Sequence, residues 1–436
     1  MLEARAQLSR ALGQIGSLPG TPDLRRRQIA LQVALANALM HAKGYASEAT
    51  RAAFDQAQAY IDHADARGEA LEDPLLRFAV IYGFWVRSFV AFNGDTVRQL
   101  AARFMALAEE QEATVPLMIA HRLMGTTLQW TGEIAGSRAH YDQAMALYDP
   151  ARHRALTTHF GQDVGVVVLS YRAWAQWLLG CPEAALADTD RAIAAAREIG
   201  QAATLMYALA HATRIFLWTG DYDAARPLVV EILALADDRE APAWRALGMM
   251  QNGSLLALTG EGAKATPLIA AGLTAWRSTG STLWMPCYLS NLALAHAEVG
   301  QFDDARARIA EAVAAVEASK ATWSEAEVHR AAGEIALLAP ESDAPGSDAA
   351  EAEACFKRAI AIAQRQQARS WELRAATSLA LLWRGQGKRR QARELLAPVY
   401  RAFTEGFETR DLREAKALLD GLGRAAPRDG LAVRRR

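Results

Sequence analysis

The densest group of potential metal ligands lies in the segment PARHRALTTHFGQD, residues 150 to 163. It contains two imidazoles and a carboxylate, from His153, His159 and Asp163, which are ligand types that zinc accepts. Nothing in this segment predicts a helix or strand that would make the three side chains converge. We therefore expect an insertion whose histidines form local hydrogen bonds, and we predict no metal site.

Motifs for nucleotide binding or nucleophilic catalysis are incomplete. GQGKRR at 385 to 390 lacks the upstream glycine and the hydroxyl residue of a phosphate-binding loop, and GEGAKA at 260 to 265 follows a predicted helix instead of a strand. The cysteines are isolated, so spacing supplies no nucleophile with a base beside it. The sequence predicts no catalytic residue and no cofactor, which indicates a protein that is not an enzyme.

Composition excludes several further classes of protein. The 436 residues are 51% hydrophobic and 22% charged, with a formal net charge of −1. A disordered chain would hold less apolar surface, and a strongly basic nucleic-acid binder would not be neutral. The densest apolar run, from Phe78 to Val86, is too short to cross a bilayer. We predict a cytoplasmic protein with neither nucleic acid nor membrane as a partner.

A repeat explains what positions the remaining residues. Gly180, Gly220, Gly260 and Gly300 follow one another at a step of 40 residues. Looser copies surround further glycines, at Gly44, Gly94, Gly132 and Gly387. Such a fixed period is typical of a solenoid. Each unit contains an apolar helix before the glycine and an amphipathic helix after it, so the glycine is expected to end the first helix in a left-handed conformation.

Small residues recur at fixed distances from these glycines. Seven residues before the glycine the sequence has Ala173, Thr213, Gly253 and Ala293, and five residues after it Ala185, Ala225, Ala265 and Ala305. Small side chains at these spacings allow two antiparallel helices to approach closely. The fold class predicted is therefore all-α, with stacked antiparallel helix pairs in units of about 40 residues.

This pattern of small residues and interhelical turns resembles the tetratricopeptide repeat over about residues 24 to 422. The resemblance implies a right-handed α-solenoid with a concave groove. The segments LPGTPDLRRRQIALQVALANALMHAKGYAS, HFGQDVGVVVLSYRAWAQWLLGCPEAAL and YRAFTEGFETRDLREAKALLDGL also resemble the C-terminal helical-repeat region of bacterial class III adenylate/guanylate cyclase–ATPase signalling proteins. No segment matches the catalytic domains of those proteins.

Three regions are predicted along the chain. Residues 1–20 form an unpaired amphipathic helix, the edge of a repeat, in which Leu8, Leu12 and Ile15 share one face. Residues 21–422 form the repeat array, with insertions near 150–163 and 340–348, and residues 423–436 form a flexible basic tail. Because an unpaired apolar face favours association, we predict that Leu8, Leu12 and Ile15 dock on a partner or on a second copy of the chain.

Large side chains on the predicted first helices are the candidates for binding a partner. If those helices line a groove, they present tryptophan and arginine, which dominate binding hot spots: Arg122, Trp130, Trp174, Trp177, Arg214 and Trp218. The alternative is that these side chains fill the core between helix pairs. The function predicted is a non-enzymatic scaffold that binds a protein or peptide in bacterial signalling. The alternative is a regulatory module for an ATPase or cyclase on another chain.

Overall fold

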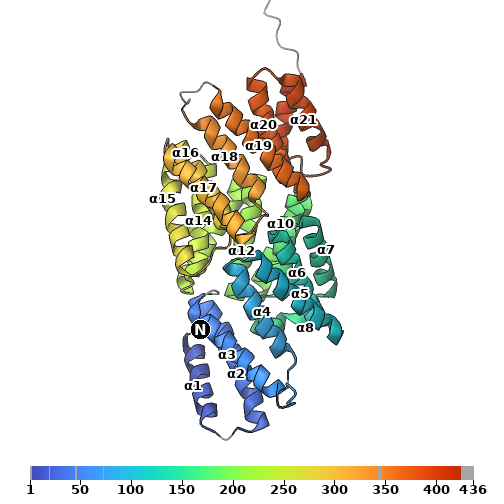
Figure 1. Cartoon of the computed structure of the whole chain (residues 1–436), viewed down its shortest axis with the longest axis vertical. Coiled ribbons are helices and arrows are strands. Elements are labelled where there is room, and N and C mark those ends of the chain that lie inside the picture. The colour runs from blue at the N-terminus through green and yellow to red at the C-terminus, as the bar shows by residue number, and fades with distance from the viewer. Residues whose placement is uncertain (1, 19, 45–46, 72, 341–345, 424–436) are drawn as a thin grey trace, which may run out of the picture.

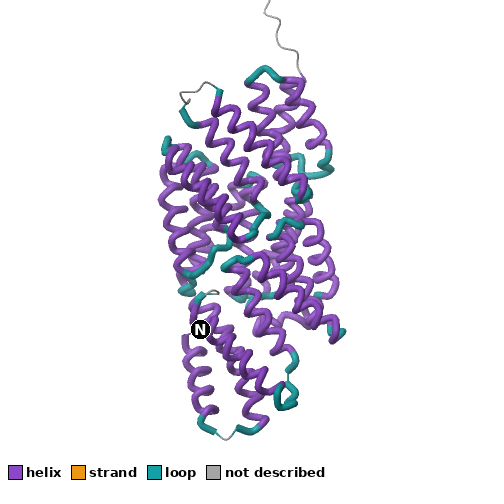
Figure 2. Tube along the Cα trace, in the orientation of Figure 1, coloured by secondary structure: helices purple, strands orange, loops and turns teal. Residues whose placement is uncertain are grey.

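The computed structural model describes residues 2–18, 20–44, 47–71, 73–340 and 346–423, and these residues contain helices and no strand (Figure 2). The N-terminal helices are α1 (Leu2–Gly16), α2 (Pro22–Lys43), α3 (Glu48–Asp65), α4 (Leu75–Val90), α5 (Gly94–Gln111), α6 (Thr114–Trp130) and α7 (Ile134–Leu147). The all-α prediction is confirmed. None of the described helices is long and apolar enough to cross a bilayer.

The second half of the chain continues the same alternation. Its helices are α10 (Val164–Leu178), α11 (Pro182–Ile199), α12 (Ala202–Thr219), α13 (Tyr222–Asp238), α14 (Pro242–Leu258), α15 (Gly262–Ser278), α16 (Met285–Glu298), α17 (Phe302–Ser319), α18 (Glu325–Leu338), α19 (Ser347–Arg365), α20 (Arg369–Gly385), α21 (Arg389–Arg401) and α22 (Arg410–Gly423). Each even-numbered helix from α2 to α6 and from α12 to α20 packs against the helix that follows it, and α10 packs against α11. The stacked pairs form one elongated array with α1–α3 at one end and α19–α21 at the other (Figure 1).

Turn glycines and small residues act as predicted. Gly220 and Gly300 lie in the left-handed region, at φ +81° and +79°, within two residues of the ends of α12 and α16. At Gly125 of α6 an added Cβ would lie 2.7 Å from Cε1 of Tyr141 on α7, so the absence of a side chain lets the two helices approach. The spacing read from the sequence therefore reflects both the turns and the helix contacts.

The insertion at 150–163 is more regular than expected. It contains three short helical turns, α8 (Pro150–His153), η1 (Arg154–Leu156) and α9 (Thr157–Phe160). Asp149 begins α8 by accepting a hydrogen bond from the amide of Ala151 at 3.0 Å. Most of the second insertion, residues 341–345, and the predicted tail beyond Gly423 lie outside the described residues.

Successive turns of the superhelix touch along a line that we call the seam. The carbonyl groups of Val90, Trp130 and Trp177 lie at or near the ends of α4, α6 and α10. They accept hydrogen bonds from Leu283 N (2.9 Å), Trp323 N (3.3 Å) and Ser370 Oγ, respectively. Donor and acceptor are 193 residues apart in each case. The array thus closes on itself, and helix ends of the first half contact helix starts of the second half.

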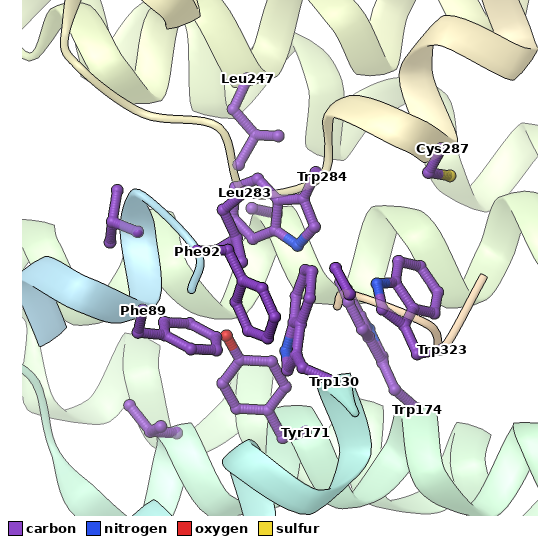
Figure 3. Packing of buried hydrophobic residues seen from close by; sticks show 14 of the residues in the cluster. Phe89, Phe92, Trp130, Tyr171, Trp174, Leu247, Leu283, Trp284, Cys287 and Trp323 are labelled. Carbon is purple, nitrogen blue, oxygen red and sulfur yellow. The ribbon is translucent and has the colours of Figure 1, made fainter. Parts of the chain in front are cut away.

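Aromatic rings fill the superhelix beneath the seam (Figure 3). The ring centroid of Trp130 lies 5.2 Å from that of Trp323 and 6.2 Å from that of Trp284. Farther along, the rings of Trp177 and Trp371 are 4.7 Å apart. These residues are buried, so the interior of the array at this level is a packed aromatic core and not an open channel.

Candidate functional site

A groove with a volume of about 600 Å³ opens between the first helices of the C-terminal half of the array. Side chains from α12, α14, α16, α18, α20 and α22 form most of it, together with Tyr222 at the start of α13. Those that decide its chemistry are Arg214, Trp218, Ser254, Leu258, Cys287, Tyr288, Asn291, Glu298, Glu327, Arg330, Glu334, Leu338, Arg374, Thr377, Leu381, Arg410 and Asp411. A ligand in this groove would contact many units of the repeat at once.

Arg214 lies at the base of the groove and is only 4% exposed. Its guanidinium carbon lies 4.7 Å from the ring centroid of Tyr288, 5.3 Å from that of Trp174 and 5.7 Å from that of Trp218. Its Nη1 donates a hydrogen bond to Cys287 Sγ at 3.1 Å. Three aromatic faces and a thiol therefore hold the cation in place.

No carboxylate neutralises this arginine within the described part of the chain. Burial lowers the pKa of Arg214 while Tyr288 and Cys287 raise it, and the net shift is upward, so the group stays charged. Its Nε and the hydroxyl of Tyr288 are buried and have no hydrogen-bond partner in that part of the chain. A buried charge that lacks a counterion is costly. Arg214 is thus the one arginine lining the groove that has no carboxylate partner among the described residues.

The opposite wall carries arginines that are fully paired. Arg330 Nε and Nη2 each donate to Glu327 at 2.8 Å, and Nη1 donates to Glu334 at 3.1 Å. Arg374 donates from Nε to Asp411 at 2.7 Å. Burial raises the pKa of Glu327, but Arg330 and Arg374 outweigh it, so the pKa of this carboxyl is lowered. This wall has its charges satisfied, in contrast to Arg214.

Exposed leucines border the groove. Leu258, Leu338 and Leu381 line it and are 45%, 52% and 42% exposed. Isolated exposed leucines are ordinary on a protein surface, but several around one concave site mark a binding surface. The groove therefore combines a cationic base, a paired polar wall and an apolar rim.

The predicted binding residues fall into three places. Arg214 and Trp218 line the groove, and Trp174 packs on the guanidinium of Arg214. Trp130 and Trp177 are buried at the seam, where their rings contact tryptophans of the second half. Arg122 lies in the N-terminal half, at a second cavity that does not include the groove residues. The structure brings together the candidates on α10 and α12 but not all six.

The predicted N-terminal docking residues lie on α1, which packs against α2. Leu8, Leu12 and Ile15 are half-buried, so their docking on another chain stays a prediction. His153, His159 and Asp163 do not gather at one point. Imidazole Nδ1 of His153 accepts from the amide of Asp149 at 3.0 Å, His159 Nε2 lies 3.2 Å from Asp73, and Asp163 accepts from the hydroxyl of Tyr148.

Sequence reasoning missed the groove residues of α16, α18 and α20, among them Tyr288, Glu327, Arg330 and Arg374. A signal was available, because a tryptophan near the start of a first helix recurs at Trp284, Trp323 and Trp371. These three tryptophans lie at the seam, where helix starts of the second half contact helix ends of the first half. The missed groove residues follow them closely in the chain.

Comparison with known proteins supports the fold. No protein-family model matches the sequence, and no characterised protein matches it by sequence either. A crystal structure of a Rap protein complexed with Competence and Sporulation Factor superposes with a TM-score of 0.59 at 11% identity, covering 91% of this chain and 99% of that one. The Rap conjugation gene regulator of plasmid pLS20, in complex with the Phr* peptide, gives a TM-score of 0.50 at 10% identity, covering 91% and 98%. In fold, the chain is a tetratricopeptide-like helical-repeat solenoid similar to these two Rap proteins.

Proposed function

We propose that this chain is a non-enzymatic, peptide-binding regulator of bacterial signalling, and that the peptide occupies the groove with a carboxylate on Arg214. The observation that carries the proposal is the buried, unneutralised guanidinium of Arg214 at the base of an elongated groove. The two Rap proteins of similar fold were solved with Competence and Sporulation Factor and with the Phr* peptide. Their ligands make a peptide the first class to test here.

Physical reasons favour an extended peptide over a compact ligand. The groove is long enough to be lined by residues from α12 to α22, and stacked helix pairs present it already formed, so binding costs little reorganisation. A peptide carboxylate would remove the electrostatic cost of Arg214 and accept from its Nε. Apolar side chains of the peptide would cover Leu258, Leu338 and Leu381, and a peptide amide could pair with Thr377 Oγ1, which has no partner in the described residues.

The test is selection of a random hexapeptide library with free C-termini on the full chain. Selected peptides are then measured by calorimetry against the wild type and Arg214→Met. We expect a consensus sequence and an affinity loss of at least about tenfold in Arg214→Met, because removing one partner of a buried charge pair costs about 2–5 kcal/mol.

Two variants serve as controls. Ala257→Trp, which fills the groove at a half-buried position, should abolish binding, and Arg122→Met, which lies at the other cavity, should leave it unchanged. Peptides that bind Ala257→Trp as well as the wild type, or the absence of any consensus, would overturn the proposal. If amidation of the peptide C-terminus has no effect, an acidic side chain of the peptide supplies the carboxylate.

The second function predicted from sequence, regulation of an ATPase or cyclase on another chain, stays a prediction. No described residue favours it over peptide binding.

A further inference from the structure

A second, smaller cavity lies in the N-terminal half of the array. Its volume is about 60 Å³. Rings form most of its wall, with a few polar groups between them: Tyr82, Trp85, Phe89, Arg122, Thr126, Gln162, Tyr171, Tyr207, Trp244, Trp276 and Trp284. Most of these residues are buried, whereas Tyr207 and Trp244 are half-buried and form its most accessible side. We call it the Arg122 cavity.

Arg122 supplies the only formal charge among the residues that line this cavity. It is 4% exposed, and its Nη2 donates to the hydroxyl of Tyr82 at 3.1 Å. That hydroxyl donates in turn to the carbonyl of Phe160 at 3.0 Å, so its proton is already used. Nη1 of Arg122 is buried and has no hydrogen-bond partner in the described residues.

The charge of Arg122 is not neutralised by the described part of the chain. Burial lowers its pKa, the neighbouring tyrosines raise it, and the net shift is upward, with no carboxylate among the contributing groups. Burial also raises the pKa of Tyr171 and of Tyr207, so both phenols stay neutral. These phenols can donate hydrogen bonds, but they cannot balance a positive charge. An unpaired buried cation costs several kcal/mol, which an anion from solution would offset.

We propose that the Arg122 cavity binds a small carboxylate of the size of acetate or propionate, with its charged end at Nη1 of Arg122 and its alkyl end among the rings. The volume supports this size. One water molecule needs about 10–15 Å³ of such space, so a cavity of about 60 Å³ has room for the few heavy atoms of acetate or propionate. The site is separate from the groove and does not depend on the proposed peptide. Its aromatic walls suit the short alkyl chain better than a hydrated inorganic ion.

The test titrates the full chain with sodium acetate and, in parallel, with neutral acetamide, at constant ionic strength set by sodium gluconate. Tryptophan fluorescence reports binding, because Trp85, Trp276 and Trp284 line the cavity. We expect a saturable change and a rising melting temperature with acetate and neither with acetamide. In Arg122→Met both responses to acetate should disappear.

Arg214→Met is the matched control, since it removes an equally buried arginine from the other site. It should keep the acetate response and lose peptide binding, whereas Arg122→Met should do the reverse, so the two proposals fail separately. If Arg122→Met does not fold, a crystal of the wild type soaked in sodium propionate replaces it, with density for the carboxylate expected within hydrogen-bond distance of Nη1 of Arg122. An acetate response that persists in Arg122→Met, a wild type without any response, or only water beside Nη1 would overturn the inference.

Discussion

One buried polar side chain, the imidazole of His211, lies among aromatic rings. His211 is 2% exposed, and its ring centroid lies 4.1 Å from that of Tyr207 and 4.7 Å from that of Trp174. Its Nδ1 lies 2.8 Å from the carbonyl oxygen of Tyr207, to which it donates, while Nε2 has no partner in the described residues. Burial lowers the pKa of this imidazole, so it is neutral at neutral pH.

Stability should therefore fall in mild acid. Burial lowers the pKa of His211 from its usual 6.5 to about 3, and that of His329 to about 4. Below pH 6.5 the unfolded chain binds protons that the folded chain does not, so the free energy of unfolding decreases as pH falls from 6.5 towards 4. Each histidine should contribute a slope of about 1.4 kcal/mol per pH unit.

Urea unfolding of the wild type and His211→Gln at several pH values measures this slope. The variant should show a smaller decrease between pH 6.5 and 4, and His63→Gln, at an exposed position, should match the wild type. Equal slopes in His211→Gln and the wild type would contradict the neutral, buried state of His211.

The turns between paired helices are of two kinds: some only reverse the chain, and others also contact a distant unit. Gly300 lies in an open turn, where an added Cβ would meet nothing within 4 Å. Gly220 has nearly the same backbone conformation, but its Cβ would lie 2.5 Å from Cβ of Arg410 at the start of α22. The first turn only reverses the chain, whereas the second also contacts a distant unit.

Two substitutions separate the energetic cost of the turn conformation from that of the contact with the distant unit. Gly300→Ala should cost about 1–2 kcal/mol, the penalty of a left-handed conformation for a residue with a Cβ. Gly220→Ala should cost about 1–3 kcal/mol more, because the methyl group also overpacks the contact with Arg410. Denaturant unfolding of both variants gives the difference, and equal losses would show that the Gly220 contact has no energetic weight.

The helix pairs were predictable from sequence because their causes are local. Gly180 and Gly260, among other turn glycines, end helices, and small residues such as Ala185 and Ala265 repeat wherever two neighbouring helices touch. The groove was only partly predictable: Arg214 and Trp218 were found through the turn that follows them. Arg330 has only the preceding Trp323 as a sequence signal, because the next 40-residue step after Gly300 falls on Pro340 and not on a glycine. Contacts between units 193 residues apart leave no periodic pattern in the sequence.

The seam changes how the whole molecule is expected to unfold. In an ordinary solenoid each repeat contacts only its neighbours, so a destabilising substitution affects only the adjacent repeats. Here Trp323 joins α18 to α6 through its amide and its ring. Distant units should therefore lose structure together.

Trp323→Ala tests this coupling. Removal of a buried tryptophan should cost about 3–5 kcal/mol, and amide hydrogen exchange should accelerate in α6 as well as in α18. Val230→Ala, at a residue that is 64% exposed, should change neither helix. Faster exchange confined to α17–α19 would show that the seam does not transmit the loss.

The constant separation across the seam also limits how such a chain can evolve. Recombination readily duplicates or deletes a unit of most repeat proteins, because the new neighbours still fit. In this chain, a gain or loss between Trp130 and Trp323 would give every earlier helix end a different partner at the same time. A gain or loss between Glu183 and Trp323 would also move Glu183 away from the amide of Gly406, from which it accepts a hydrogen bond at 2.8 Å. Homologues should therefore diverge by substitution at a constant number of units, and they should accept insertions at outer turns such as the one at Gly200, where an added Cβ meets nothing within 4 Å.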